Sequence, residues 1–481
     1  MLRKLLWLSG FEGATVMTAE LCGAKLLAPL FGSSLYVWSS VMGITLLALA
    51  SGYFFGALLS QKPGAQRNRL SALLLTASFF VSLMPLTGSY VLPGLMFWPL
   101  LTGVVAGTLL VLFVPVFLLG ASSPLFISLQ SVDPGTAGKM SGYVYAISTL
   151  GGIVSTFLCG FYLIPELGIK LTLLLFASIL LFATMFLLGV PFFRALPIIL
   201  FSGCTVLLLQ KECKSCMYHS EGILGEIKVF DKNDSSGKIR ILTVNDIIQS
   251  EMRLKDRSSA SAYVGLIDKL VPLSGKQSHA LVLGLGAGLT SNLLIRKGYS
   301  VDAVELDARI ISSARNYFGL SEKVQVFTDD ARRFLNTNKK SYHIVLVDVF
   351  KAEEQPSHVI TSESLRALKS DLHKGARILI NWHGYSHGKL GEGTTVMLNT
   401  LKSSGYFTKC CTNSVQEDHR NIIIMASLEP LPFLPNEIEI DTKITDHENS
   451  DNFQILEKAN ALANKRWRSL YMEYYRKNGL N

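Results

Sequence analysis

The stretch that decides the fold of the second half of this chain is His279-Ala-Leu-Val-Leu-Gly-Leu-Gly-Ala-Gly-Leu-Thr290. An apolar run of strand length leads into three glycines at alternating positions, and a helix-forming run follows. The next apolar run ends in Val304-Glu-Leu-Asp307. A strand, a glycine-rich turn, a helix and a second strand with a terminal carboxylate form the pattern of a nucleotide- or adenosyl-binding α/β domain.

The composition of the chain changes near residue 210. Residues 1–210 contain nine Lys/Arg and four Asp/Glu, whereas the remaining 271 residues contain 36 and 32. The first part is too poor in charge for a soluble domain, and the second part has an ordinary composition. The net charge of +9 forms no basic block of the kind that binds nucleic acid, but it fits anionic lipid at a membrane surface.

The first part predicts a bundle of six or seven membrane spans over residues 1–210. A span needs roughly 20 apolar residues, and six stretches qualify: 5–30, 37–60, 70–92, 95–119, 140–164 and 171–189. A seventh, 190–209, is broken by Arg194 and Pro197, and we expect it to be interfacial or re-entrant. Basic residues near alternate span ends predict a multi-pass protein of the inner (cytoplasmic) membrane with its soluble part in the cytoplasm.

Several glycines within the apolar stretches are expected to allow close packing between helices. They are Gly52, Gly56, Gly142, Gly151, Gly152 and Gly160.

The second part divides into three regions. Residues 211–275 predict a small β-subdomain, because two alternating runs flank the polar turn 231–237. Residues 276–430 alternate short apolar strands with amphipathic helices, which predicts a mostly parallel, doubly wound Rossmann-like sheet. Residues 431–481 predict a polar, loose linker around 441–452 and a C-terminal helix that docks on its own domain rather than on the membrane.

Candidate ligand-binding residues lie where successive predicted strands end. Gly284, Gly286 and Gly288 let a ligand approach the backbone, and Glu305 can accept the hydroxyl groups of a ribose. Asp329 or Asp330 follows the third strand, and Asp348 ends the fourth. The alternative interpretation is that such acids cap the following helices. Cys213 and Cys216 have no second pair at zinc-site spacing, so we expect no metal.

These residues carry a resemblance to spermidine synthases, the polyamine aminopropyltransferase family. It extends over about residues 220–385, and residues 1–210 resemble the membrane region of bacterial membrane-fused spermidine synthase-like proteins. The matching stretches of the soluble part are Leu224-Gly-Glu-Ile-Lys-Val, Val244-Asn-Asp-Ile-Ile-Gln-Ser, the glycine run, Val304-Glu-Leu-Asp, Thr328-Asp-Asp-Ala-Arg-Arg-Phe and Ile344-Val-Leu-Val-Asp348. Those of the membrane part are Leu27-Ala-Pro-Leu-Phe-Gly-Ser-Ser-Leu-Tyr-Val-Trp, Ser122-Ser-Pro-Leu and Tyr145-Ala-Ile-Ser-Thr-Leu-Gly-Gly.

The resemblance implies a methyltransferase-type Rossmann-like fold and decarboxylated S-adenosylmethionine as the donor of an aminopropyl group. It implies Asp348 as the acceptor of the amine proton and Glu305 as the ribose ligand. It also places the adenine beside Asp330 and Ala331, and the acceptor entrance at Gln249 and Tyr263.

Three features depart from the family pattern. The usual Tyr-His pair before the glycine loop appears here as Tyr263-Val264. Ala287 replaces an aspartate that holds the amine of the donor, and Lys351 replaces an aspartate that binds the amine acceptor. The adenosyl half of the site is therefore expected to be intact and the amine half to be altered, because Lys351 would repel a cationic acceptor.

Three functions remain open on the sequence. The first is a membrane-bound aminopropyltransferase of polyamine biosynthesis that uses a small amine as acceptor. The second is an S-adenosylmethionine-dependent methyltransferase, and the third is a non-catalytic protein that binds polyamines or is linked to their transport. Expected partners are an adenosyl-sulfonium donor, a small amine and the lipid bilayer, with a homodimer left open and no nucleic acid.

Overall fold

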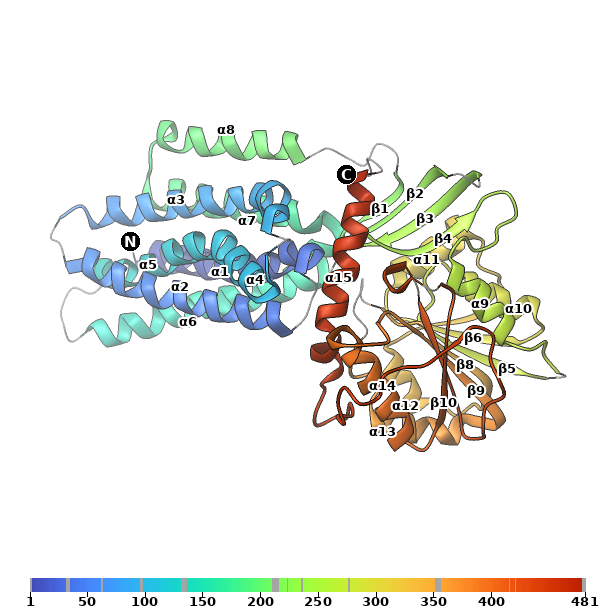
Figure 1. The fold of residues 1–481 in the computed structure, drawn as a ribbon. Coiled ribbons are helices and arrows are strands. Elements are labelled where there is room, and N and C mark those ends of the chain that lie inside the picture. The colour runs from blue at the N-terminus through green and yellow to red at the C-terminus, as the bar shows by residue number, and fades with distance from the viewer. Residues whose placement is uncertain are drawn as a thin grey trace. The chain divides into compact units, whose positions relative to one another are not determined.

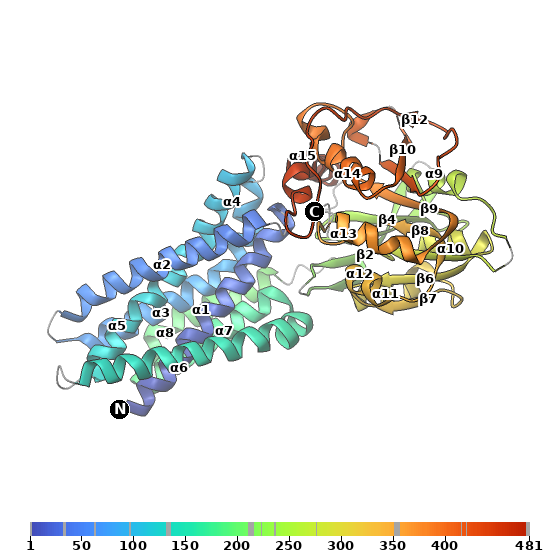
Figure 2. The ribbon, with the colours of Figure 1, turned by 90° about the horizontal axis from the view of Figure 1, so that it is seen from below.

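The computed structural model describes residues 2–31, 35–61, 64–95, 98–130, 136–209, 216–222, 224–234, 237–275, 277–350, 356–414, 416–419 and 421–477. The chain forms two compact units. One comprises residues 1–214 and 220–225, and the other comprises residues 215–219 and 226–481. Figures 1 and 2 show the elements of each unit.

The first unit consists of apolar helices. They are α1 (Leu2–Phe31), α2 (Leu35–Gln61), α3 (Gln66–Leu86), α4 (Leu100–Thr108), α5 (Val114–Gln130), α6 (Ala137–Leu158), α7 (Ile164–Leu188) and α8 (Phe192–Leu209), with short π or 3₁₀ segments continuing some of them. Within the described residues, five helical stretches are long and apolar enough to cross a membrane. The predicted apolar helical region is therefore present, and its multi-pass topology stays a prediction.

An elbow divides the longest of these stretches, Ala137–Leu188. Its 52 residues far exceed the roughly 20 that one crossing needs. Gly168 interrupts the helix with φ 78° and ψ 173°, a conformation that favours glycine. The amide of Ile169 donates to the Glu221 carboxylate at 2.8 Å, which provides an acceptor for a backbone group that the break exposes. The separate spans predicted over 140–164 and 171–189 correspond to the two arms, and the total number of crossings stays a prediction.

Helix α8 packs within this unit along α3 and α7. The rings of Phe79 and Phe201 lie 4.7 Å apart, and the hydroxyl oxygens of Ser82 and Ser202 lie 2.9 Å apart. The segment predicted to be interfacial or re-entrant is thus a regular helix of the bundle. Its 18 residues are slightly short for a full span. The interfacial or re-entrant placement of this helix therefore stays a prediction.

Most of the glycines predicted to allow close packing do so. A Cβ atom at Gly52 or Gly56 would overlap the backbone of α5, and one at Gly151 would overlap the Gly10 carbonyl of α1. A Cβ at Gly152 would overlap the side chain of Met17. Gly142 and Gly160 have open space around them, so the packing interpretation is wrong for these two.

A four-stranded sheet opens the second unit. Its order is β1 (Cys216–Ser220), β2 (Ile227–Asp234), β3 (Gly237–Val244) and β4 (Ile247–Arg253). Strands β2, β3 and β4 are antiparallel. Asn245 and Asp246, with φ 51° and 61°, connect β3 to β4, as expected for a two-residue hairpin turn. The predicted small β-subdomain is present. Its predicted hairpin is the antiparallel pair β2–β3, but residues 231–234, predicted as turn, continue strand β2.

The large sheet has eight strands in the order β12-β10-β11-β9-β8-β5-β6-β7. Strands β5 (His279–Leu283), β6 (Ser300–Glu305), β7 (Gln325–Thr328), β8 (Tyr342–Val347) and β9 (Leu372–Trp382) are parallel. Strands β11 (Ile422–Ser427) and β10 (Phe407–Thr412) add antiparallel neighbours, and β12 (Glu437–Ile438) pairs with β10. The predicted mostly parallel, doubly wound sheet is confirmed, whereas β10 and β12 were not predicted.

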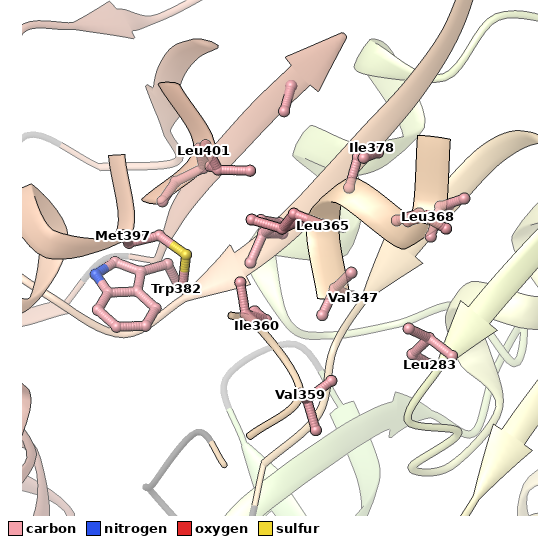
Figure 3. Packing of buried hydrophobic residues seen from close by; sticks show 14 of the residues in the cluster. Leu283, Val347, Val359, Ile360, Leu365, Leu368, Ile378, Trp382, Met397 and Leu401 are labelled. Carbon is pink, nitrogen blue, oxygen red and sulfur yellow. The ribbon is translucent and has the colours of Figure 1, made fainter. Parts of the chain in front are cut away.

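Helices cover both faces of this sheet. Helices α9 (Ala262–Leu270), α10 (Leu289–Arg296) and α11 (Ala308–Phe318) pack on one face. Helices α12 (Ala331–Thr337), α13 (Ser362–Leu368), α14 (Glu392–Ser403) and α15 (Leu456–Lys477) pack on the other. Figure 3 shows part of this second core, in which Leu283, Val347 and Ile378 of the sheet lie near Leu365 and Leu368 of α13.

The C-terminal helix docks on its own unit, as predicted. Leu456 and Ala459 of α15 belong to the core, and Trp467 is buried. The preceding segment, however, is not loose. Asn449 is fully buried, and its side-chain amide donates to the carbonyl oxygens of Ser357 and Ile360 at 2.8 and 2.6 Å. Polar composition gave the wrong prediction because these polar groups satisfy buried backbone acceptors.

Candidate active site

The candidate site lies at the carboxyl ends of the parallel strands. The glycine loop follows β5, Glu305 ends β6, Asp329 follows β7, Asp348 follows β8 and Asn381 lies near the end of β9. Open α/β sheets bind their ligands along this edge. The predicted candidates from different strands therefore belong to one edge of the sheet.

The glycine loop adopts backbone conformations that require glycine. Gly284, Gly286 and Gly288 have φ values of 88°, 52° and 75°. A Cβ atom at Gly284 would overlap the carbonyl of Asp348, so the absence of a side chain brings the loop against the end of β8. The loop and Asp348 are thus joined by a close backbone contact that no larger residue permits.

Ser250 of β4 supports the loop from the small sheet. Its hydroxyl accepts a hydrogen bond from the Ala287 amide at 3.1 Å. Ala287 is itself only 1% exposed. Ser250 was not identified as a site residue, although it follows Gln249 within a stretch that the resemblance includes.

Glu305 holds the loop from the other side. Its carboxylate accepts from the amides of Leu285 and Asp307 at 3.1 and 3.0 Å. Burial raises the pKa of Glu305, while the backbone hydrogen bonds act in the opposite direction. Because an ionised carboxylate has about four acceptor positions, these two contacts leave capacity for ribose hydroxyls.

The acids after β7 have structural roles. Asp330 caps α12, because its carboxylate accepts from the Arg333 amide at 3.0 Å, and its other oxygen lies 3.1 Å from His358 Nε2. Asp329 forms an ion pair with Arg333 at 2.8 Å. The capping alternative is therefore correct for Asp330. Ala331, predicted to lie beside adenine, is the buried first residue of α12.

Asp348 is buried between two hydrogen-bond donors. The hydroxyl of Tyr263 on α9 donates to Oδ2 at 3.1 Å, and the Asn381 side-chain amide donates to Oδ1 at 2.8 Å. The Asn421 amide in turn donates to Asn381 Oδ1 at 2.9 Å, which fixes the orientation of the Asn381 amide. Asp348 and Tyr263 were predicted site residues, whereas Asn381 and Asn421 were not.

The surroundings of Asp348 favour a proton-accepting role. Burial raises the pKa of Asp348 above that of an ordinary carboxyl group, and the bonds from Asn381 and Tyr263 lower it in part. A carboxylate whose pKa is raised toward neutral accepts a proton more readily from a reacting group. The geometry thus provides a positioned base beside a glycine loop.

The other predicted residues, Gln249 and Lys351, have no described contact with Asp348. Gln249 lies on β4, where its side-chain amide makes a long, 3.4 Å contact with the Ile247 carbonyl. Lys351, the residue predicted to oppose a cationic acceptor, lies outside the described residues, as does Cys213.

A full-length comparison places the chain among known proteins. It is 22% identical over 482 residues to polyamine aminopropyltransferase 2 of Aquifex aeolicus, and the match covers 95% of this chain and 94% of that protein. The chain is thus distantly similar, over its full length, to a polyamine aminopropyltransferase. The resemblance predicted from the sequence is confirmed at that level. No protein-family model matches the chain.

Other relatives match a shorter part of the chain. The chain is 25% identical over 192 residues to a probable polyamine aminopropyl transferase of Bifidobacterium longum, covering 39% of this chain and 41% of that protein. It is 29% identical over 170 residues to an N-terminal histidine N-methyltransferase of Emericella nidulans, covering 33% and 29%. The chain therefore spans less than half the length of these two relatives.

Solved structures similar to the chain include two spermidine synthases. A probable spermidine synthase from Corynebacterium glutamicum is 18% identical with a TM-score of 0.38, covering 43% of this chain and 78% of that one. Spermidine synthase from Thermotoga maritima is 13% identical with a TM-score of 0.37, covering 52% and 88%.

The buried charge of Asp348 predicts a stability effect with a defined pH dependence. Burial raises the pKa of Asp348 in the folded state. Asp348 therefore contributes to the free energy of unfolding at pH values below its pKa in the unfolded chain. This contribution is lost as pH rises through the pKa of the folded state. Asp348→Asn should therefore raise the melting temperature of the purified full-length protein at pH 7, with a smaller gain at pH 4.5. An equal change at both pH values, or the same gain from Asp446→Asn at an exposed site, would contradict this assignment.

Proposed function

We propose that the C-terminal unit transfers an aminopropyl group from decarboxylated S-adenosylmethionine to a small amine. The observation that supports this most strongly is Asp348, a buried carboxylate oriented by Tyr263 and Asn381 against the glycine loop. The full-length similarity to a polyamine aminopropyltransferase supports the same donor class.

The reaction follows from the charge of the donor. The sulfonium makes its attached propyl carbon electrophilic, and the lone pair of the acceptor nitrogen attacks this carbon. The carbon–sulfur bond breaks with its electron pair passing to sulfur, which releases 5′-methylthioadenosine. The nitrogen loses a proton, and Asp348 receives it.

The proposed site has a region that binds the donor and a region that binds the acceptor. Gly284, Gly286 and Gly288 would lie against the donor, Glu305 would accept the ribose hydroxyls, and the side of the site with Asp329, Asp330 and Ala331 would face adenine. Gln249, Tyr263 and Lys351 would border the acceptor. Asp330 would then both cap α12 and contact the donor.

Methyl transfer from S-adenosylmethionine is the second candidate. The match to a histidine N-methyltransferase over 170 residues favours it, because a methyl group on the same sulfonium is equally electrophilic. The two candidates share the adenosyl pocket and differ in the group transferred. Comparing the two donors as substrates distinguishes them.

The proposed location is the cytoplasmic face of the inner membrane, anchored by the apolar helices. Adenosyl donors are made in the cytoplasm, and the basic residues near the span ends favour that side. The number of crossings decides the side, because an additional crossing by α8 would place the C-terminal unit outside.

Glu305 should be required for donor-side binding. Saturation of the full-length protein with 5′-methylthioadenosine at a hundredfold over its Kd should stabilise it by about 2.7 kcal/mol. Glu305→Ala should abolish the increase in melting temperature, whereas Glu322→Ala, at an exposed position, should retain it. Equal increases in all three proteins would remove Glu305 from the pocket.

Asp348 should be required for turnover but not for donor binding. Asp348→Asn should lower turnover roughly 10²- to 10⁴-fold, which is the usual contribution of a positioned base. The stabilisation by 5′-methylthioadenosine should be unchanged. Steady-state rates with decarboxylated and ordinary donors provide the measurement, and methyl transfer alone would favour the second candidate.

A reporter after Asn481 should report a cytoplasmic location. A green fluorescent protein fusion should fluoresce, and an alkaline phosphatase fusion should be inactive, because each reporter works on one side of the membrane. The reverse pattern would mean that α8 crosses the membrane and that the C-terminal unit does not meet cytoplasmic donors.

A further inference from the structure

A row of four aromatic rings lies next to the catalytic region and has no role in the reaction described above. The ring of Phe350, after β8, lies 4.4 Å from that of His383, after β9. The His383 ring stacks at 4.9 Å on Trp467 of α15, which lies 5.9 Å from Tyr471 on the next helical turn. We call these residues the ring stack.

The strand pattern connects the ring stack to Asp348. Strands β8 and β9 are parallel neighbours, with Val347 opposite Ile380. Alternate residues of an extended chain point to the same side. Phe350 follows Asp348 by two residues, and His383 follows Asn381 by two. The bonded pair Asp348–Asn381 is therefore followed by the stacked pair Phe350–His383.

Two polar atoms of the ring stack are buried without partners among the described residues. They are Nδ1 of His383, whose residue is only 9% exposed, and Nε1 of Trp467. Burial lowers the pKa of His383 to about 4, so the imidazole is neutral at pH 7 and one of its nitrogens accepts. The indole nitrogen can only donate. Buried polar groups normally have partners. In the tautomer with the proton on Nε2, His383 Nδ1 is an unpaired acceptor beside the unpaired Trp467 donor, and a ligand that both donates and accepts would satisfy the two atoms.

We propose that the ring stack is the acceptor subsite of the transferase. Its ligand is an aliphatic amine whose far end carries an uncharged group that both donates and accepts hydrogen bonds, such as a hydroxyl. This inference rests on the proposed function. The reacting nitrogen lies at Asp348, and the far end lies along the edge of His383 and Trp467.

A diamine fits these atoms less well. Its second ammonium group has only donors, so it can pair with His383 Nδ1 but leaves the indole N–H of Trp467 buried and unpaired. The competing feature is Glu251 of β4, whose charge adds to burial in raising the pKa of Tyr471 and would attract a cation. Two ligands of equal length distinguish these effects.

The test is calorimetric binding to the full-length protein in detergent, saturated with 5′-methylthioadenosine. The ligands are 4-amino-1-butanol and 1,4-diaminobutane. The amino alcohol should bind at least about tenfold more tightly, which corresponds to one or two uncharged hydrogen bonds. Diamine binding equal to or tighter than amino alcohol binding would overturn the proposal without any variant.

Two variants assign the contacts. Trp467→Phe and His383→Phe keep an aromatic ring in the stack but remove the polar atom. Trp467→Phe should weaken amino alcohol binding about five- to tenfold without weakening diamine binding, because the diamine makes no bond to the indole. His383→Phe should weaken the binding of both ligands, because both pair with Nδ1. His447→Phe, at an exposed histidine, is the matched control and should change neither. Unchanged selectivity in both stack variants, with 5′-methylthioadenosine stabilisation intact, would also overturn the proposal.

A separate assay tests the proposed aminopropyl transfer. Incubation of the same ligands with decarboxylated S-adenosylmethionine reports aminopropyl transfer. Selective binding of the amino alcohol without transfer to either ligand would support the subsite and reject the transferase. Transfer to the diamine with no selectivity from His383 or Trp467 would support the transferase and reject the subsite.

Discussion

The hydrogen bonds to Asp348 are the interaction on which the candidate site depends. A carboxylate buried at the end of β8 is unfavourable unless donors compensate for lost water. Tyr263 and Asn381 provide these donors, and Asn421 fixes the amide of Asn381. The donors come from α9, β9 and the residue before β11, so three separate elements must be in place before the charge can be buried. Such sites commonly cost stability in exchange for reactivity.

The donor half and the acceptor half of the proposed site are built differently. The donor half is formed by consecutive units of one sheet, because the glycine loop and Glu305 are joined by hydrogen bonds between neighbouring strand ends. The acceptor half combines residues that are far apart in the chain, from β4, α9, β9 and α15. Acceptor preference can therefore change through α15 or β4 while the adenosyl-binding half is retained.

Close backbone contacts at glycines contribute to the packing of the helical unit. Gly52 and Gly56 lie against α5, and Gly151 lies against Gly10 of α1. Close approach of this kind increases van der Waals contact between helices where the hydrophobic effect provides little driving force. The elbow at Gly168 depends on Glu221, a residue that follows all of the apolar helices in the chain. The fold of this unit thus includes a contact from beyond its last helix.

The sequence by itself determined the apolar helical region, the small hairpin sheet and the succession of the parallel strands along the chain. These features follow from hydrophobic periodicity and glycine positions, which are local properties. Its motifs also predicted Glu305 and Asp348 as site residues, and the family resemblance predicted Tyr263. The sequence could not identify Asn381, Asn421, Ser250 or the ring stack.

Only the tertiary structure showed that these residues lie at or beside the candidate site. Hydrogen bonds between distant segments leave no periodic pattern in the sequence. The tertiary structure also decided that Asp330 caps a helix and that Asn449 anchors the segment before α15. A carboxylate at a strand end can cap a helix, bind a ligand or accept a proton. Its function depends on which donors approach it, and those donors are brought together only when the chain folds.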